Sequence, residues 1–200
     1  MLVKTFGSAL NGIDAITVTI EVNSDRGVQF FLVGLPDSAV KESQQRIESA
    51  LNSNGLKYPR RKITINMAPA DIRKEGSSYD LPLAIAILAA TEQVSAERLD
   101  KYVIMGELSL DGGINPIKGA LPIAMKAAEE GFEGIVVPKA NANEAAVVEN
   151  LKVYGVETIM EVVDFFNGTS NLEPVKLDLE DGTGNDFYDF DFSDVRGQPA

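Results

Sequence analysis

A run of ten apolar residues, Leu81 to Ala90, constrains the fold more than any other feature of this sequence. The run is about half as long as a helix that crosses a bilayer. Asp80 before it and Pro82 within it are typical of a helix N-terminus, because proline is tolerated in the first turn. Since the run is apolar all round, every face of the helix has to be covered. We therefore predict a central buried helix that is capped by Asp80.

The first third of the chain is predicted to consist mostly of strands. Apolar residues alternate with polar ones through residues 14–23, which is the period-two pattern of a half-buried strand. Asn11-Gly12 is a hairpin signal that joins this strand to another at 2–10. A third strand is expected at 28–33. Together the three strands predict an antiparallel meander.

The remaining segments mix helices and strands. Asp37 is predicted to cap a helix over 38–52, and Asp111-Gly112-Gly113 is predicted to form a tight turn after a strand at 102–110. Further strands are expected at 62–67, 135–137 and 152–156, and further helices at 119–130, 141–149 and 158–166. This order of elements indicates an α+β fold, with helices packed on a mixed sheet.

Composition excludes several kinds of site. The chain has no cysteine and no histidine, which removes disulfides, thiolate metal sites and the commonest general base and zinc ligand. No metal site is expected. The formal net charge is −12, and residues 171–200 contain eight acidic and two basic residues. An acidic chain argues against broad nucleic-acid binding by charge alone.

Two segments contain polar residues that could form a catalytic or anion-binding site. Gly76-Ser77-Ser78 opens the predicted buried helix, where free N–H groups favour a nucleophile or an anion. The alternative is an ordinary polar loop with a capping serine. Glu107 and Asp111 could form an acid–base pair, but turn-capping and solvated roles are commoner for such carboxylates.

A basic cluster follows the first predicted helix. Its members are Lys57, Arg60, Arg61 and Lys62, with Arg73 and Lys74 not far along the chain. Such a cluster can bind phosphate, or it can be a solvated loop. Tyr58 is the one aromatic residue within it, and no repeated interleaving of aromatic and basic residues supports base stacking. The sequence contains no G-x-x-x-x-G-K-[ST], so no nucleotide-binding residues are assigned in this chain.

Six motifs, in order along the chain, are similar to those of one protein family. They are VGLPD (33–37), INMAPAD (65–71), KEG with YDLP (74–82), GELSLDG (106–112), PIKGALP (116–122) and DFSDVRGQ (191–198). By these motifs, the chain resembles the N-terminal part of the ComM/YifB family of Mg-chelatase-like, ChlI-related AAA+ ATPases. The resemblance covers essentially the whole chain outside residues 169–190.

The resemblance implies a fold, a division of the chain and a cellular role. It implies a ribosomal protein S5 domain 2-like domain at 1–168, similar to the Lon protease domain and to the C-terminal domain of RadA. An acidic flexible linker at 169–190 and the start of the AAA+ module at 191–200 would follow. ATP and Mg²⁺ would bind in that module and not in this fragment.

The whole protein implied by the family is a cytoplasmic ATPase without membrane segments. Its expected partners are its own AAA+ module, further copies in a homo-hexamer, and DNA, on which it would drive branch migration in recombination and natural transformation. This fragment would not be the enzyme. The N-terminal segment also has no apolar run of secretory-signal length, which agrees with the cytoplasmic expectation.

The similarity to Lon raises the question of peptidase activity, because Lon-type peptidases use a Ser-Lys dyad. Aligning the motifs places Ser78 at the nucleophile and Ile123 at the catalytic lysine. Isoleucine cannot accept a proton, and Lys118 and Lys126 are the nearest substitutes. We therefore expect a non-catalytic domain, with a Ser-Lys peptidase and an autonomous DNA-binding module as the two alternatives.

Overall fold

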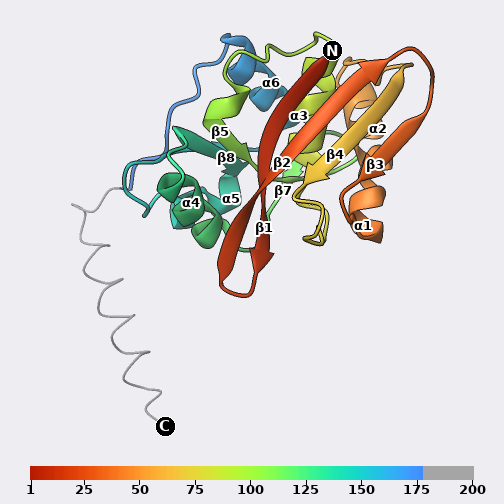
Figure 1. Ribbon diagram of the computed structural model, residues 1–200. Coiled ribbons are helices and arrows are strands. Elements are labelled where there is room, and N and C mark those ends of the chain that lie inside the picture. The colour runs from red at the N-terminus through yellow and green to blue at the C-terminus, as the bar shows by residue number, and fades with distance from the viewer. Residues whose placement is uncertain (178–200) are drawn as a thin grey trace.

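The computed structural model describes residues 1–177, which form one mixed seven-stranded sheet with helices against it (Figure 1). The strand order is β3-β4-β2-β1-β5-β8-β9. These strands are β1 Leu2–Asn11, β2 Asp14–Asp25, β3 Phe30–Val33, β4 Lys62–Ala68, β5 Tyr102–Ile104, β8 Gly134–Pro138 and β9 Lys152–Val156. A separate two-stranded sheet pairs β6 Glu107–Leu108 with β7 Ile114–Asn115.

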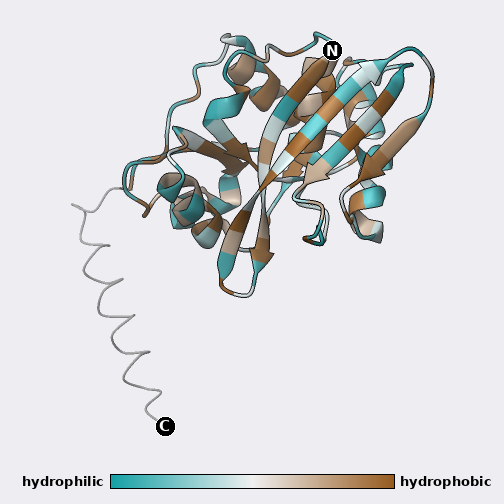
Figure 2. Ribbon diagram, viewed as in Figure 1, coloured by the Kyte–Doolittle hydropathy of each residue, from teal (hydrophilic) through white to brown (hydrophobic). Residues whose placement is uncertain are grey.

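The β1–β2 hairpin confirms the alternating pattern. Val18, Ile20 and Val22 are fully buried, whereas the residues between them are partly exposed. Asn11 pairs with Asp14, so the turn itself consists of Gly12, with φ 65°, and Ile13. A positive φ is the conformation that glycine adopts at little cost. The alternation is visible as brown and teal bands along both strands in Figure 2.

The predicted antiparallel meander is wrong at its third strand. β3 does not pair with β2; it lies parallel to β4, with Phe31 opposite Thr64, at the edge of the sheet. β4 occupies the place beside β2, antiparallel to it. The other half of the sheet is parallel, because β1, β5, β8 and β9 all run in one direction.

Helix α3, Asp80–Ala90, is the predicted central helix, and all of its residues are buried. It packs against β1 and β2 on one face of the sheet, where Thr5 Oγ1 donates to the Pro82 carbonyl over 3.0 Å. Phe6, the next residue, points to the other face and packs edge-on against Phe132 beyond α4. The prediction that Asp80 caps the helix is wrong, because the N-cap residue is Tyr79.

The other helices differ from the predicted ranges where the chain is interrupted. They are α1 Ser38–Lys41, α2 Ser43–Ser53, α4 Ala120–Glu129, α5 Lys139–Ala145, α6 Ile159–Asn167 and the 3-10 helix η1 Leu99–Lys101. The helix expected over 38–52 is thus broken at Glu42, although Asp37 does cap it by accepting from Val40 N over 2.8 Å. The strand expected over 102–110 is broken at Met105 and Gly106, between β5 and β6.

The segment after α6 continues along the domain as far as the structure describes it. Val175 N donates to the Val153 carbonyl over 2.7 Å, and Leu172 and Val175 pack against the core. The remainder of the predicted linker, 178–190, and the predicted AAA+ start, 191–200, lie outside the described residues. Within residues 1–177, no helix has the length and apolar character needed to cross a membrane.

Candidate functional site

A cleft of about 850 Å³ lies beside the N-terminal end of α3. Four parts of the chain form its walls: the end of the β1–β2 hairpin, the loop that leads into α3, the segment from β5 to β6, and the start of α4. Residues that line it include Leu10, Gly76, Ser77, Ser78, Tyr79, Met105, Glu107, Ile117, Lys118 and Ile123. Both residues that the Lon comparison singled out, Ser78 and Ile123, therefore face one cleft.

Ser78 is held by its backbone against the β5–β6 connection. Its carbonyl accepts from Gly106 N over 2.8 Å, and Leu81 N donates to the Gly106 carbonyl over 3.0 Å. A Cβ at Gly106 would lie 3.0 Å from Ile114 and 3.1 Å from Leu81, so the close approach depends on glycine. The Ser78 hydroxyl makes no hydrogen bond within residues 1–177.

Ile123 is only 2% exposed, in the first turn of α4. Lys118 lines the cleft, but its side chain is exposed and is in no hydrogen bond or salt bridge to another described residue. Lys126 does not line the cleft, and its Nζ lies 3.8 Å from Glu129 on the solvent side of α4. No described amine is therefore hydrogen-bonded to Ser78.

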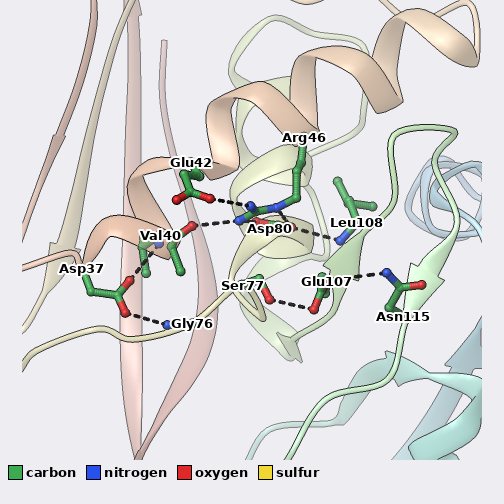
Figure 3. A network of polar contacts seen from close by, with 11 residues as sticks. Asp37, Val40, Glu42, Arg46, Gly76, Ser77, Asp80, Glu107, Leu108 and Asn115 are labelled. Carbon is green, nitrogen blue, oxygen red and sulfur yellow. Dashed lines mark hydrogen bonds and ion pairs between the residues drawn. The ribbon is translucent and has the colours of Figure 1, made fainter.

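The carboxylate of Glu107, which lines the cleft, binds Ser77, the residue before Ser78. Ser77 Oγ donates to Glu107 Oε2 over 2.7 Å, and Asn115 Nδ2 lies 3.4 Å from Glu107 Oε1 (Figure 3). Asp111, considered with Glu107 as an acid–base pair, accepts from Gly113 N over 2.9 Å in the tight turn. Glu107 and Asp111 thus have separate structural roles, and no pattern in the neighbouring sequence indicates the contact with Ser77.

A buried ion pair joins α2 to the N-terminal end of α3, beside the cleft. Arg46 of α2 donates from Nε and Nη2 to the two oxygens of Asp80, over 2.6 and 2.9 Å. Leu108 N also donates to Asp80, over 3.0 Å, which joins α2, α3 and β6 at one carboxylate (Figure 3). Burial raises the pKa of Asp80, and the hydrogen bonds from Arg46 and Leu108 oppose that rise.

Lys74 is fully buried, which removes it from the basic surface that the sequence suggested. Its Nζ donates to the carbonyls of Gly34, over 2.7 Å, and of Pro69. Burial lowers the pKa of Lys74. Asp37 reinforces this junction, because its Oδ2 accepts from Gly76 N over 3.1 Å. The VGLPD and KEG motifs therefore hold two loops together beneath the cleft.

The four candidate nucleic-acid residues are only partly brought together. Arg61 Nε donates to Ser24 Oγ over 3.0 Å, and Lys62 pairs with Asp25 across β4 and β2. Arg60 precedes them and is exposed. Lys57 lies apart, because its backbone N–H and carbonyl bind the Gln93 side chain just after α3. No cluster of three potential metal-ligating side chains exists among residues 1–177.

Comparisons with known proteins agree with the motifs. The family model for subunit ChlI of Mg-chelatase matches residues 20–141. Competence protein ComM of Haemophilus influenzae is 40% identical, over 98% of this chain and 39% of its own length. YifB of Escherichia coli K12 is 40% identical, over 94% of this chain and 36% of its own. The archaeal Lon protease of Thermococcus kodakarensis is 26% identical, over 68% and 22%.

The chain spans less than two fifths of the length of ComM and of YifB. The mixed sheet with helices, together with the similarity to Lon, confirms the predicted α+β fold of the Lon protease domain type. The family predicted from the motifs is likewise confirmed, because the identity extends over nearly the whole chain. The chain belongs to the Mg-chelatase-like family described by the ChlI model, together with ComM and YifB.

Proposed function

We propose that residues 1–168 are a non-catalytic N-terminal domain of a Mg-chelatase-like AAA+ ATPase. The observation that carries the proposal is the state of the Lon-like cleft. Ser78 faces it without a hydrogen-bonded base among residues 1–177, and Ile123, which is buried, stands at the lysine position. A serine hydroxyl is a weak nucleophile unless a neighbouring group takes its proton. In this proposal the cleft holds a serine but no group bonded to it that could accept its proton.

The role of the whole protein is a broader part of the same proposal. Residues 169–190 would link the domain to an AAA+ module that begins near 191–200 and binds ATP and Mg²⁺. The name of the competence protein ComM supports a role in DNA uptake and recombination, and a cytoplasmic homo-hexamer that migrates DNA branches is the form we expect. In that assembly, residues 1–168 supply a rigid scaffold to the motor.

Two preparations of the protein test whether ATP hydrolysis belongs to the AAA+ module and not to residues 1–168. The full-length protein is compared with a form that lacks residues 1–168, in ATP hydrolysis and in branch migration of a synthetic four-way junction. We expect ATP hydrolysis to persist in the shortened protein and branch migration to fall. Loss of all ATP hydrolysis on truncation, or ATP hydrolysis by the 200-residue chain alone, would contradict the proposal.

A point substitution supplies the matched control. Ser78→Ala in the full-length protein removes the hydroxyl without disturbing the backbone contacts to Gly106. A non-catalytic domain predicts unchanged branch migration in this variant. A loss as large as that caused by deleting the domain would show that the hydroxyl performs chemistry, and the non-catalytic assignment would then be wrong.

A further inference from the structure

One end of the sheet concentrates positive charge in this acidic chain. There β2 ends, β3 and β4 begin, and the loop 26–29 crosses between them. The basic residues at this end are Arg26, Arg60, Arg61 and Lys62, which we call the basic corner. They come from two segments more than thirty positions apart, and the fold brings them together.

Three contacts place these residues at one point. Lys62 lies opposite Asp25 in the β2–β4 register, and Arg61 donates to Ser24 at the end of β2. Gly27 approaches Lys62 so closely that a Cβ on the glycine would lie 3.1 Å from the Lys62 Cβ. Arg26 is therefore next to Lys62 in space, and Arg60 is next to Arg61 in the chain.

The charge of the basic corner is not neutralised by ion pairs. None of its four cations forms a salt bridge with a described carboxylate, whereas Arg46, Arg73, Lys126 and Lys139 all do. Asp25 is the acidic residue paired across the strands here, and it accepts instead from Asn23 Nδ2 over 2.9 Å. A local surplus of cations in a chain of net charge −12 calls for an anionic partner.

Phe31 adds an aromatic surface to the basic corner. Its side chain is 45% exposed on the outer face of the edge strand β3, and Lys62 Nζ lies 5.7 Å from the ring centroid. The local sequence does not place Phe31 beside Lys62, because the two residues are about thirty positions apart in the chain and meet only through the β3–β4 pairing. A base stacked on that face of Phe31 would displace Lys62 Nζ from over the ring and leave the ammonium free to meet the base's own phosphate.

We propose that the basic corner with Phe31 is a binding site for single-stranded nucleic acid. Cations that follow a phosphate backbone beside an exposed aromatic ring are what sequence-tolerant single-strand sites use. A duplex offers phosphates but hides the faces of its bases, so Phe31 favours the unpaired strand. The site is separate from the cleft at Ser78, and its test is independent of whether that cleft is catalytic.

The test measures fluorescence anisotropy of a labelled oligothymidylate of about 20 nucleotides, titrated with the 200-residue chain. A hairpin duplex of the same length is the comparison, and salt is varied from about 50 to 200 mM. We expect tighter binding to the single strand. We also expect log K to fall with log salt by about 0.7 for each phosphate contacted, a slope of about 2 to 3 in all.

Two sets of substitutions, one in the cations and one at Phe31, separate charge from stacking. Arg26→Glu with Arg60→Glu should weaken binding at least tenfold and flatten the salt dependence. Phe31→Ala should weaken single-strand binding by about 5- to 100-fold with an unchanged salt slope, and Phe31→Trp should restore it. The matched controls are Lys126→Glu with Lys139→Glu, for charge, and Leu110→Ala, for an exposed apolar side chain elsewhere on the domain.

The following outcomes would overturn the proposal. Equal losses in the control variants would mean that only overall charge matters, and an unchanged affinity in Phe31→Ala would mean that no base stacks there. Val33 and Leu35 extend the apolar edge beyond Phe31, so light scattering of each variant checks for self-association. Concentration-dependent dimers of the unmodified chain, abolished by Phe31→Ala, would assign the surface to a protein contact instead. Circular dichroism confirms that each variant is folded.

Discussion

Ser77 Oγ donates a 2.7 Å hydrogen bond to Glu107 Oε2, so the carboxylate in the cleft binds the serine that precedes Ser78. This pairing ties the loop before α3 to β6, on the wall of the cleft. Within residues 1–177, Ser77 and not Ser78 is therefore the serine that donates to Glu107. The contact is therefore structural in our account, and its removal should affect stability.

Glu107→Ala should lower the free energy of unfolding by about 1–2 kcal/mol, because it removes a hydrogen bond to a charged acceptor. Glu107→Gln retains an acceptor oxygen and should cost less. Urea denaturation followed by circular dichroism measures both variants. Equal losses in Glu107→Gln and Glu107→Ala would show that the carboxylate charge, and not merely an acceptor oxygen for Ser77, is what the loop requires.

Arg46→Met should destabilise the domain strongly, by about 3–5 kcal/mol, because it leaves the buried carboxylate of Asp80 without a cation. Arg46 donates two hydrogen bonds to Asp80, whose side chain has no exposure to solvent. Arg46→Lys supplies a charge but cannot reproduce the two-pronged geometry, so its cost should be intermediate. Denaturant unfolding at constant pH ranks the three proteins.

The deficit of Arg46→Met should also depend on pH. Burial already raises the pKa of Asp80, and loss of the arginine raises it further. A raised carboxyl pKa means that the folded state binds a proton more tightly than the unfolded state, so stability falls as pH rises through that pKa. The deficit relative to the unmodified protein should therefore shrink from about pH 7.5 to about pH 5.5. A deficit that grows on acidification would contradict this sign.

Lys74→Met should cost about 1–3 kcal/mol, because the carbonyls of Gly34 and Pro69 lose their shared donor. The methionine side chain still fills the buried space, so packing changes little. Lys41→Met, at an exposed position on α1, is the control and should be neutral. A neutral result for Lys74→Met would show that the cost of burying the ammonium equals what its two hydrogen bonds contribute.

Gly34→Ala should be among the most damaging single substitutions in the domain, at about 2–4 kcal/mol. Gly34 has φ 110°, and a Cβ there would lie 2.1 Å from the Met67 carbonyl oxygen. Gly55→Ala is the matched control, because Gly55 also has a positive φ, 72°, but nothing lies within 4 Å of its Cβ position. The control should show only the backbone cost of about 1 kcal/mol. Thermal unfolding of the pair separates the clash from the backbone strain.

The parts of the fold that follow from local pattern were predictable from the sequence. The alternation through β2 and the uniformly apolar α3 each require a particular burial, and both are confirmed. The partner of β3 was not predictable in this way, because an isolated strand pattern does not say which strand it joins. The loop before β3 allowed a hairpin with β2, and the fold pairs β3 with β4.

The roles of the polar residues at the site could not be predicted from local sequence pattern either. Asp80 precedes an apolar run and so looks like a cap, but its partner Arg46 lies 34 positions earlier on another helix. Lys74 looks like part of a basic surface, and it is buried because two distant loops offer carbonyls to it. In both cases the deciding contact is long-range, so neither role has a signature in the neighbouring sequence.

Labelling of the folded chain with a serine-reactive fluorophosphonate tests most directly whether this domain is non-catalytic. Such a probe reports whether a base activates a serine hydroxyl. Among residues 1–177 no base is hydrogen-bonded to Ser78, and the resemblance to Lon implies that Ile123 stands at the lysine position. We therefore predict labelling no greater than that of Ser78→Ala, and no cleavage of an unfolded peptide substrate. Stoichiometric labelling that disappears in Ser78→Ala, together with peptide cleavage that Lys118→Met abolishes, would contradict the account.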